Sequence, residues 1–423
     1  MDVNVSERLY TMHLRPNNKL YRLGLLVLFV FLAPLALFVS TPLDRIYQGY
    51  PQNDLSLSNS FSQLLLEVNS TALYKCADRI ASAVNESTLP QTTKDFLGML
   101  AALMNPFSAA LYQKSLLSTY SRFPDSTELK RKLAKHSSCF DETVPSVAVC
   151  SIQLASGPFL EEWLAHYLLI GVNMIIIYDS GNPLSSQSKH MRGIAQPFVQ
   201  AGFVEIIDWY FTSGSGSSYH QVEAYDHCLK NKTEFSWIGM LDIDEFVVLH
   251  PPKTPCLNHF LVDYQQYGAL AMQWRNFVPR GVVNHNHSLL HFEQYHWTRE
   301  EAVVKLFFNR NFTTSSDGPH NGHYVQNKSA VNFQKQREEG FIIHHIQGDP
   351  FQEIEVSHFW SRDWMFTFFD KLCGQSDERE HWLNGRMRIM IEFANEDNCR
   401  KVEPSTRYNA PLRSVLGLDL NMY

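Results

Sequence analysis

The chain has 423 residues, of which 44% are hydrophobic and 13% aromatic, a composition sufficient for a large buried core. Its formal net charge is −7, and it contains no lysine or arginine block and no nucleic-acid motif, which excludes nucleic acid as the main partner. By length alone, the chain holds two or three domains, or one large domain with an appendage.

An apolar segment near the N-terminus predicts a membrane anchor. Residues 23–43 form a run of 21 residues without a charge. As a helix this run spans roughly 31 Å, about one bilayer core. Basic residues precede the run and are scarce after it, so the positive-inside rule places residues 1–22 in the cytosol. The alternative is a cleaved signal peptide, but the segment is longer than a usual signal core and no A-x-A site follows it.

Sequons and cysteines agree with the secretory pathway that such an anchor implies. The seven cysteines contain no C-x-x-C pattern, which excludes a zinc ribbon, and in an oxidising compartment some of them should pair. The odd count leaves at least one cysteine outside an intramolecular disulfide, and proximity along the chain suggests Cys373–Cys399 as one pair. Six Asn-x-Ser/Thr sequons follow the apolar segment and predict a glycoprotein; their asparagines are Asn69, Asn85, Asn231, Asn286, Asn311 and Asn327.

Residues 44–145 predict a helical stem or accessory region. Apolar residues recur at helical spacing over 61–84 and 94–118, with breaks at Pro90 and Pro106. These segments carry no concentration of residues that would support a reaction.

An alternation of strands and helices begins after residue 145 and predicts an α/β domain over 146–400, followed by a C-terminal tail over 401–423. Successive strand–helix–strand units predict a mostly parallel sheet flanked by helices, and ligands of such sheets bind at the carboxyl ends of the strands. The predicted strands are 147–154, 173–182, 203–209 and 237–249; the predicted helices are 158–171, 186–202 and 219–231; and a flexible loop is predicted at 211–218.

The strand predicted at 237–249, WIGMLDIDEFVVL, carries three acids inside an apolar run. Ionised carboxylates out of water are costly unless they are paired or bound to a metal. Asp242 and Asp244 lie two residues apart, so in a strand they point to the same side, near its carboxyl end. Such a pair suits a hard divalent cation, Mn²⁺ or Mg²⁺, while Glu245 points the other way. The alternative is a strand end whose acids are solvated or paired with lysine or arginine.

Asp179 and Gln221 are two further candidate contacts of a nucleotide. Asp179 follows the second strand, where an acid can accept hydrogen bonds from a base or a ribose; alternatively, it closes the strand as an Asx turn. Gln221 opens the helix after the 211–218 loop and is placed to reach a donor or an acceptor; alternatively, it is a surface glutamine. The chain has no G-x-G-x-x-G or G-K-[ST] motif, so neither a dinucleotide cofactor nor a P-loop is supported.

Residues 146–375 resemble glycosyltransferase family 92 and its relatives of the GT-A fold. Two departures accompany the match: the turn after the first strand reads QLASGP, and Ser357 and Phe359 flank His358. Both put the donor choice or the activity in question. The matching pieces are FLEEWLAHYLLIGVNMIIIYDSG (159–181), QVEAYDHCL (221–229), WIGMLDIDEF (237–246), HFEQYHW (291–297), AVVKLFFNR (302–310), PH (319–320) and VSHFW (356–360).

The resemblance implies a membrane-anchored, metal-dependent hexosyltransferase. Such an enzyme takes a sugar, expected to be galactose-like, from a UDP-sugar and adds it to a glycan acceptor, with the D-x-D acids holding Mn²⁺ on the diphosphate. By position in the resemblance, His358 and then His320 are favoured as the metal's imidazole ligand. A single-pass type II protein of the Golgi membrane, or alternatively of the ER membrane, is the expected setting.

The catalytic base remains unassigned, and two other functions stay open. An inverting transferase needs a carboxylate that accepts the proton of the acceptor hydroxyl. One alternative is a catalytically inactive GT-A-fold membrane protein that binds sugars or acts as a scaffold. The other is a metal-dependent phosphohydrolase, but H-x-D or D-x-H pairs for a second metal are not evident, and the absence of H-E-x-x-H disfavours a zinc protease. The candidate bases are Glu293, Glu300, Glu301, Asp317 and Asp349.

Overall fold

The computed structural model describes most of the chain from residue 70 to residue 418. The predicted cytosolic tail, the anchor over 23–43 and the sequon at Asn69 lie outside the described residues. No helix in the described part is both long enough and apolar enough to cross a membrane. Within 70–418, the structure leaves out residues 103, 105–108, 110–111, 113–115, 118, 137, 140–142, 154–156, 211–219, 344–345, 374–379 and 396–398.

The first half of the central sheet is parallel, as predicted. Its strands are β1 (Val147–Gln153), β2 (Met174–Asp179), β3 (Val204–Asp208) and β4 (Trp237–Met240), paired in the order β4-β1-β2-β3. The intervening helices are α8 (Gly157–Leu169), α9 (Ser186–Gln200) and α10 (His220–Asn231). The chain leaves α8 and α9 through glycines in the left-handed region, Gly171 (φ 93°) and Gly202 (φ 81°), where a side chain would be strained.

The second half of the sheet corrects the prediction of a mostly parallel sheet. β6 (Ala269–Phe277) and β7 (Trp297–Asn309) pair antiparallel, and β7 also lies antiparallel to β4. β12 (Ile354–His358) runs parallel to β6 but antiparallel to β5 (Glu245–Leu249), so the sheet as a whole is mixed. The reason is that no long crossover helix joins β6 to β7, and strands joined without one run antiparallel.

Shorter elements complete the domain. They are α11 (Leu257–Leu261), η3 (Val262–Tyr264), α12 (His291–Gln294), β8 (Thr313–Ser316), β9 (Gly322–Tyr324), β10 (Ala330–Val331), β11 (Arg337–Glu338), α13 (Trp364–Phe366), η4 (Thr367–Leu372), α14 (Glu380–Ala394), β13 (Arg400–Lys401) and α15 (Asn409–Leu416).

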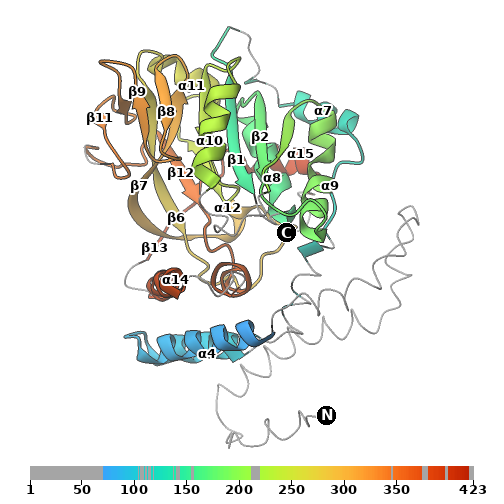
Figure 1. Ribbon diagram of the computed structural model, residues 1–423, viewed down its shortest axis with the longest axis vertical. Helices are drawn as coiled ribbons and strands as arrows, with labels where there is room; N and C mark the ends of the chain where they lie inside the picture. Colours follow the sequence, from blue (N-terminus) through green and yellow to red (C-terminus); the bar gives the residue numbers. More distant parts are fainter. Residues whose placement is uncertain are drawn as a thin grey trace, which may run out of the picture. The chain divides into compact units, whose positions relative to one another are not determined.

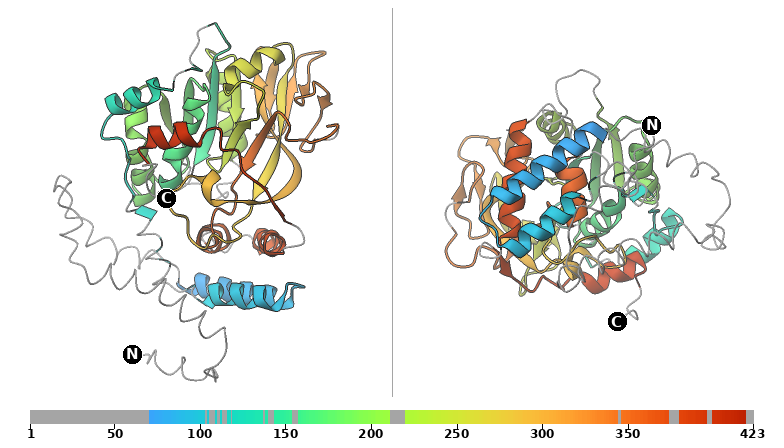
Figure 2. Two further views of the ribbon diagram at one scale, coloured as in Figure 1. Left: turned by 180° about the vertical axis from the view of Figure 1, so that it is seen from behind. Right: turned by 90° about the horizontal axis from the view of Figure 1, so that it is seen from below.

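Alternate residues of β1 face two different hydrophobic clusters, as the pleat of a strand requires. Val147 and Val149 pack into the cluster that contains the apolar residues of α8 and α9. Ala148 and Cys150 pack into the cluster that contains those of α10. Figure 1 shows α10 crossing one face of the sheet, and Figure 2 shows α15 on the opposite side. Both faces of β1 are therefore buried, which explains its unbroken apolar sequence.

The helices before residue 146 share a core with the rest of the domain. They are α4 (Ser70–Glu86), α5 (Gln91–Ala102) and α7 (Ser126–Ala134). α4 and α5 overlap the helices predicted at 61–84 and 94–118, although α4 ends at Glu86 and α5 begins at Gln91. Their Ile80 and Leu97 are fully buried in the same cluster as Met390 of α14. Seen from below, α4 and α5 lie across α14 (Figure 2).

The predicted C-terminal tail contains a packed helix. Leu412, Val415 and Leu416 of α15 are buried, and α15 contacts α8 and α7. Residues 409–416 therefore belong to the hydrophobic core of the domain.

Three disulfides cross-link distant parts of the sequence: Cys76–Cys373, Cys139–Cys256 and Cys150–Cys228. The predicted Cys373–Cys399 pair is therefore wrong, and Cys399 lies outside the three disulfides. Proximity along the chain failed as a guide because α4 and the end of η4 are neighbours in space although 297 residues separate the two cysteines.

Candidate active site

The two aspartates of the D-x-D motif lie in a turn. β4 ends at Met240 and β5 begins at Glu245, so the single strand predicted over 237–249 is wrong. The chain changes partners here: β4 pairs with β1 and β7, whereas β5 pairs with β12. The turn closes with a hydrogen bond from the Glu245 amide to the Asp242 carbonyl (3.0 Å). Both aspartates therefore sit beyond the carboxyl end of β4, the edge at which such sheets bind ligands.

Asp242 is held by three side chains. Lys305 of β7 places its Nζ 2.9 Å from Asp242 Oδ2, and this lysine side chain is only 1% exposed. Gln221 Nε2 and Tyr225 Oη, both on α10, donate to Asp242 Oδ1 at 3.2 and 3.3 Å. The predicted contact residue Gln221 thus lies beside the D-x-D motif.

Asp244 faces the segment after β12. Its Oδ2 lies 3.2 Å from Lys371 Nζ, and its Oδ1 lies 3.7 Å from His358 Nε2. The Asp244 carbonyl accepts a hydrogen bond from the Phe359 amide (2.7 Å). The fold therefore brings Asp244 and His358 together. The two residues are 114 positions apart in the sequence, so sequence spacing does not predict their contact.

Glu245 is fully buried behind the aspartates. Its Oε2 lies 3.1 Å from Lys305 Nζ and accepts a hydrogen bond from the Asp242 amide (2.9 Å). Its Oε1 has no hydrogen-bond partner among the described residues and lies 4.0 Å from His358 Nε2. Glu245 thus supports the turn from behind while one oxygen remains available.

The charges at this edge are set by burial and by the two lysines. Burial opposes ionisation of both aspartates, but Lys305 at Asp242 and Lys371 at Asp244 prevail and hold the pKa of each below its ordinary value. Burial dominates at Glu245, whose pKa is raised well above its usual range despite Lys305. The two aspartates are therefore the ionised pair, and Glu245 retains a proton more readily.

The rings of His358 and His320 both lie next to the Trp274 ring. The ring centroids of His358 and Trp274 are 4.2 Å apart, and those of His320 and Trp274 are 5.4 Å apart. His358 Nδ1 bonds to Asn276 Oδ1 (2.6 Å), which leaves Nε2 toward the acids. Burial lowers the pKa of each imidazole to about 4, so both are neutral at neutral pH.

The donor atoms at this site suit a hard divalent cation in their chemistry but are not assembled around one point. Aspartate oxygens and a neutral imidazole nitrogen are acceptable ligands of Mn²⁺. Within the described part of the chain, no three acid, histidine or cysteine ligand atoms of this site lie within 4.8 Å of one another. Each aspartate instead pairs with a lysine, so an ion bound by Asp242, Asp244 and His358 requires Lys305 or Lys371 to move aside.

Asp179 lies at the same edge but is engaged within the protein. Its carboxylate is buried and accepts hydrogen bonds from Ser188 Oγ (2.6 Å), Arg192 Nε (2.8 Å) and the Gly181 amide (3.1 Å). The last bond makes an Asx turn at the end of β2. A nucleotide contact at Asp179 stays a prediction, and it requires a rearrangement of this network.

Among the candidate bases, Glu301 is the one connected to the histidine. The Asn276 side chain, which bonds to His358, favours ionisation of the Glu301 carboxyl group. Burial raises the pKa of Glu301 despite the nearby Arg299. Glu293 pairs with Arg413 at 2.7 Å, Asp317 pairs with His323 at 2.9 Å, and Asp349 lies on an exposed loop.

Sequence reasoning missed three residues of the site: Lys305, Lys371 and Tyr225. Lys305 had a signal, because a lone lysine inside the apolar strand AVVKLFF has to be paired if it is buried. Tyr225 follows Gln221 by one helical turn, so it faces the same side of α10. Lys371 had no signal, since its contact with Asp244 depends on where η4 packs.

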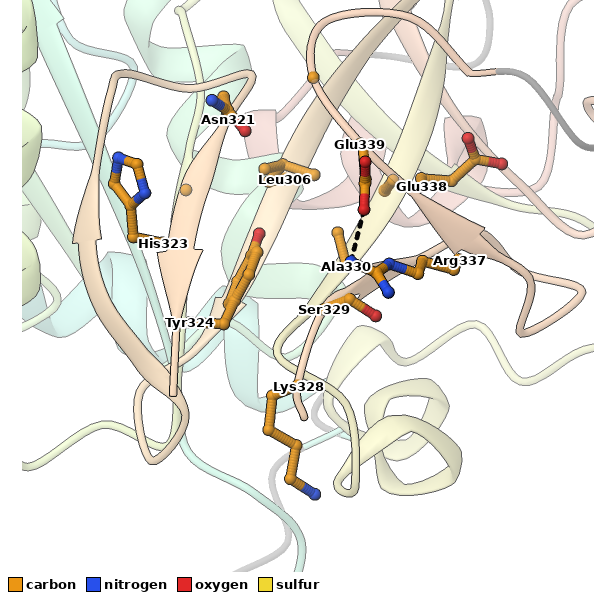
Figure 3. Close-up of a pocket in the computed structure, with 13 residues that line it drawn as sticks. Leu306, Asn321, His323, Tyr324, Lys328, Ser329, Ala330, Arg337, Glu338 and Glu339 are labelled. Atoms are coloured by element: carbon orange, nitrogen blue, oxygen red, sulfur yellow. Dashed lines mark ion pairs between the residues drawn. The ribbon is translucent and has the colours of Figure 1, made fainter. Parts of the chain in front are cut away.

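A cavity of about 300 Å³ lies apart from the acids (Figure 3). Its lining includes Leu306 of β7, Ala271 of β6 and Tyr324 of β9, together with the ion pair Arg337–Glu339. Leu306 follows Lys305 directly, and neighbouring side chains of a strand point to opposite faces. The cavity therefore opens on the other face of β7 from the D-x-D site.

Comparison with known proteins identifies relatives of the domain that carries these residues. The family model described as glycosyltransferase family 92 matches residues 146–371, just over half of the chain. A glycosyltransferase family 92 protein of Arabidopsis thaliana is 28% identical over 181 residues, which is 38% of this chain and 27% of the relative. One from Oryza sativa subsp. japonica is 26% identical over 149 residues, 32% of this chain and 22% of the relative. The matches thus span about a quarter of these relatives.

A solved structure also resembles the chain, but weakly. It is the mannosyltransferase PcManGT from Pyrobaculum calidifontis in complex with GDP-Man and Mn²⁺, 13% identical, with 82% of each chain covered and a TM-score of 0.29. This score is too low to support an argument about fold or activity.

Proposed function

Since the chain belongs to glycosyltransferase family 92, as its resemblance to the family predicted, we propose that it is a glycosyltransferase that uses a nucleotide sugar. The observation that carries the proposal is the cluster of Asp242, Asp244, Lys305, Lys371 and His358 at the carboxyl end of β4. It combines acids and cations at the sheet edge where nucleotides bind in α/β folds.

The lysines match the charge that develops in such a reaction. When a sugar leaves a nucleoside diphosphate, negative charge grows on the departing phosphate oxygens. Lys371 is 21% exposed at its side chain and stands beside Asp244, so it is accessible to a phosphate. Lys305 is buried, and its role is to fix Asp242 and Glu245. A galactose-like hexose carried by UDP, transferred to a glycan acceptor, is the donor chemistry we propose.

Mn²⁺ or Mg²⁺ is part of the proposal, with Asp242, Asp244 and His358 as the residues that would hold it. Bound there, the ion would neutralise the diphosphate as a Lewis acid. The oxygen and imidazole donors support this assignment. The lysine pairs oppose it, because they already balance the charge of both aspartates.

The lysine pairs also favour a second candidate, a family member that retains the fold but has lost activity and binds sugars. Aspartates that are permanently occupied by lysines cannot bind a metal–diphosphate complex. The two functions differ in a single measurable respect, which is whether the protein releases a nucleotide from any nucleotide sugar.

A donor screen tests the proposal. The purified full-length chain is incubated with a panel of UDP- and GDP-sugars and Mn²⁺, and release of the nucleotide is measured. We expect hydrolysis or transfer with at least one donor, and a loss of about 10²-fold or more in Asp242→Asn and Asp244→Asn, since each removes a charge that positions the donor.

Asp263→Asn is the matched control, because Asp263 is an exposed aspartate of η3 outside the site and its replacement should leave the rate unchanged. Turnover that is equal in all four proteins, or absent with every donor, would overturn the proposed activity. The second outcome would favour the sugar-binding alternative.

We propose that the domain works in the lumen of the Golgi or the ER, held by residues 23–43. The three disulfides support this setting, because disulfides persist in oxidising compartments. The five sequon asparagines within the described part of the chain are all exposed, which makes them accessible to glycosylation.

A further inference from the structure

A second group of metal-ligating side chains lies behind the D-x-D site, on α8, on α12 and on the segment that leads into α12. Glu162, His285 and His291 are all buried, and one ligand atom from each lies within 4.8 Å of the others. It is the one group of three such residues with this spacing among the described residues. The proposed transferase chemistry uses none of the three.

Hydrogen bonds join two members of this group, Glu162 and His291. Glu162 accepts from the His291 amide and bonds to His291 Nδ1, both at 2.9 Å. His291 Nε2 is buried and has no hydrogen-bond partner within the described residues. Nε2 lies on the far side of the ring from Glu162, so an ion held by both residues would lie between the Glu162 carboxylate and His291 Nδ1, in place of the hydrogen bond that joins them.

The second histidine is positioned by its backbone and by a tyrosine. The His285 amide donates to Asp363 Oδ2 (3.0 Å), and His285 Nδ1 bonds to Tyr295 Oη (3.1 Å). The ring centroids of His285 and His291 are 4.8 Å apart, and His287 lies at the same distance from His285. His287 also lines a cavity of about 170 Å³ next to the cluster, although Glu162, His285 and His291 do not line it.

Charges around the cluster both oppose and favour a cation. Arg362 lies over the Phe159 ring at 3.9 Å, and Arg122 pairs with Glu161 at 2.8 Å, so two positive charges are near. The negative charges near the cluster outnumber these two positive charges, because three acids lie there: Glu161, Glu162 and Asp363. The surroundings therefore do not forbid a divalent ion.

We propose that Glu162, His285 and His291 bind a Zn²⁺ ion, distinct from any metal of the D-x-D site. Two histidines and one carboxylate form a recognised zinc ligand set that leaves one position for water or a fourth ligand. The ion would join α8 to the segment before α12. Because the His291 ring contacts Phe246, the residue after Glu245, the ion would also brace the strand that follows the acids.

Metal analysis of the full-length chain tests this proposal. The protein is dialysed against buffer without chelator and its zinc content is measured by mass spectrometry; it is then stripped with chelator and titrated with Co²⁺ while the visible absorption is followed. We expect about one zinc per chain and a Co²⁺ spectrum typical of nitrogen and oxygen ligands. The near-isosteric variants Glu162→Gln and His285→Asn should weaken binding about 10- to 100-fold or more, judged from losses at supporting residues of zinc sites.

Two controls separate this site from its surroundings. Tyr295→Phe removes a hydrogen bond to His285 but keeps all three ligands, so it should retain the zinc. The double variant Asp242→Asn/Asp244→Asn should also retain it, which distinguishes this site from the proposed donor site. Chelator should lower the thermal unfolding temperature of the wild type but not that of Glu162→Gln.

The proposal is overturned if the wild type neither retains zinc nor binds Co²⁺, or if His285→Asn binds as tightly as the wild type. If a variant does not fold, the wild-type stoichiometry and its response to chelator still decide the question.

Discussion

Lys305 is the buried cation around which the acids beyond β4 are arranged. It lies 2.9 Å from Asp242 and 3.1 Å from Glu245, and its side chain is 1% exposed. A buried charge stays in place only while its partners remain, because removing one partner of a buried pair costs about 3–5 kcal/mol. The Asp242 side chain is one third exposed. The Lys371 side chain is more accessible than that of Lys305, so Lys371 is the lysine that a substrate can displace at lower cost.

The pH dependence of turnover tests Glu301 as the base at the residue scale. Burial raises the pKa of Glu301, and a base must be ionised to accept a proton. Activity should therefore fall as the pH drops through this raised value, at a higher pH than the ordinary value of about 4.3 would give. Glu301→Gln should lower kcat about 10²- to 10⁴-fold and abolish this acid limb in the pH profile of kcat/KM.

Asp349→Asn is the control for Glu301, because Asp349 lies on an exposed loop and its loss should leave kcat and the pH profile unchanged. A Glu301→Gln protein with wild-type kcat would remove Glu301 from consideration as the base.

The sequence predicted the aspartates better than their partners. Asp242 and Asp244 stand out because three acids in an apolar run need partners for their charges, and the run itself contains none. Lys371 could not be predicted, since it reaches Asp244 only through the packing of η4, 127 residues later. Sequence spacing carries information about contacts within one element, but not about which surfaces two distant elements place together.

At the scale of elements, helix α8 supports the turn that carries the acids. Trp163 Nε1 and Tyr167 Oη each donate to the Glu245 carbonyl at 2.9 Å. Tyr167 Oη also accepts a hydrogen bond from the Val247 amide (3.2 Å). Two side chains one turn apart on α8 therefore fix the start of β5, and with it the position of Asp244.

Tyr167→Phe tests this support. It removes one of the two side-chain hydrogen bonds to the Glu245 carbonyl and the bond that the buried Val247 amide donates to Tyr167, so the free energy of unfolding should fall by about 1–3 kcal/mol, measured by urea denaturation. The value of kcat/KM should fall as well, because Asp244 loses a fixed position.

Tyr264→Phe removes a buried hydrogen bond of similar length, to the Phe333 carbonyl (2.8 Å), away from the site. It should cost similar stability while leaving kcat/KM near the wild-type value. Equal activity of the two variants would show that α8 does not position the acids.

The elements of the first half of the domain were predictable, whereas the second half was not. Strands such as β1 and β2 are short apolar runs bounded by turn residues, and each is followed by a helix that ends near a glycine. β5 escaped prediction because it continues the apolar run of β4 after only four residues of turn. Its partner β12 lies about a hundred residues away, and no local pattern specifies that pairing.

At the scale of the whole molecule, N-glycosylation tests the proposed luminal position. Asn85, Asn231, Asn286 and Asn311 are exposed, as is Asn327, so none needs unfolding to be modified. In eukaryotic cells, the chain should migrate faster on a gel after enzymatic removal of N-glycans. Replacing the six sequon asparagines that follow residue 43 by glutamine should abolish that change, and an unshifted wild type would place the domain outside the secretory pathway.

The Cys76–Cys373 disulfide has a consequence for any proteolytic release of the enzyme. A protease that cuts the backbone anywhere between these two cysteines leaves both fragments covalently joined, because the bond closes a loop of the chain. If residues 23–43 hold the protein in a membrane, shedding into the medium requires a cut between residue 43 and Cys76, or reduction of that bond. A secreted form should therefore have its new N-terminus within this short interval.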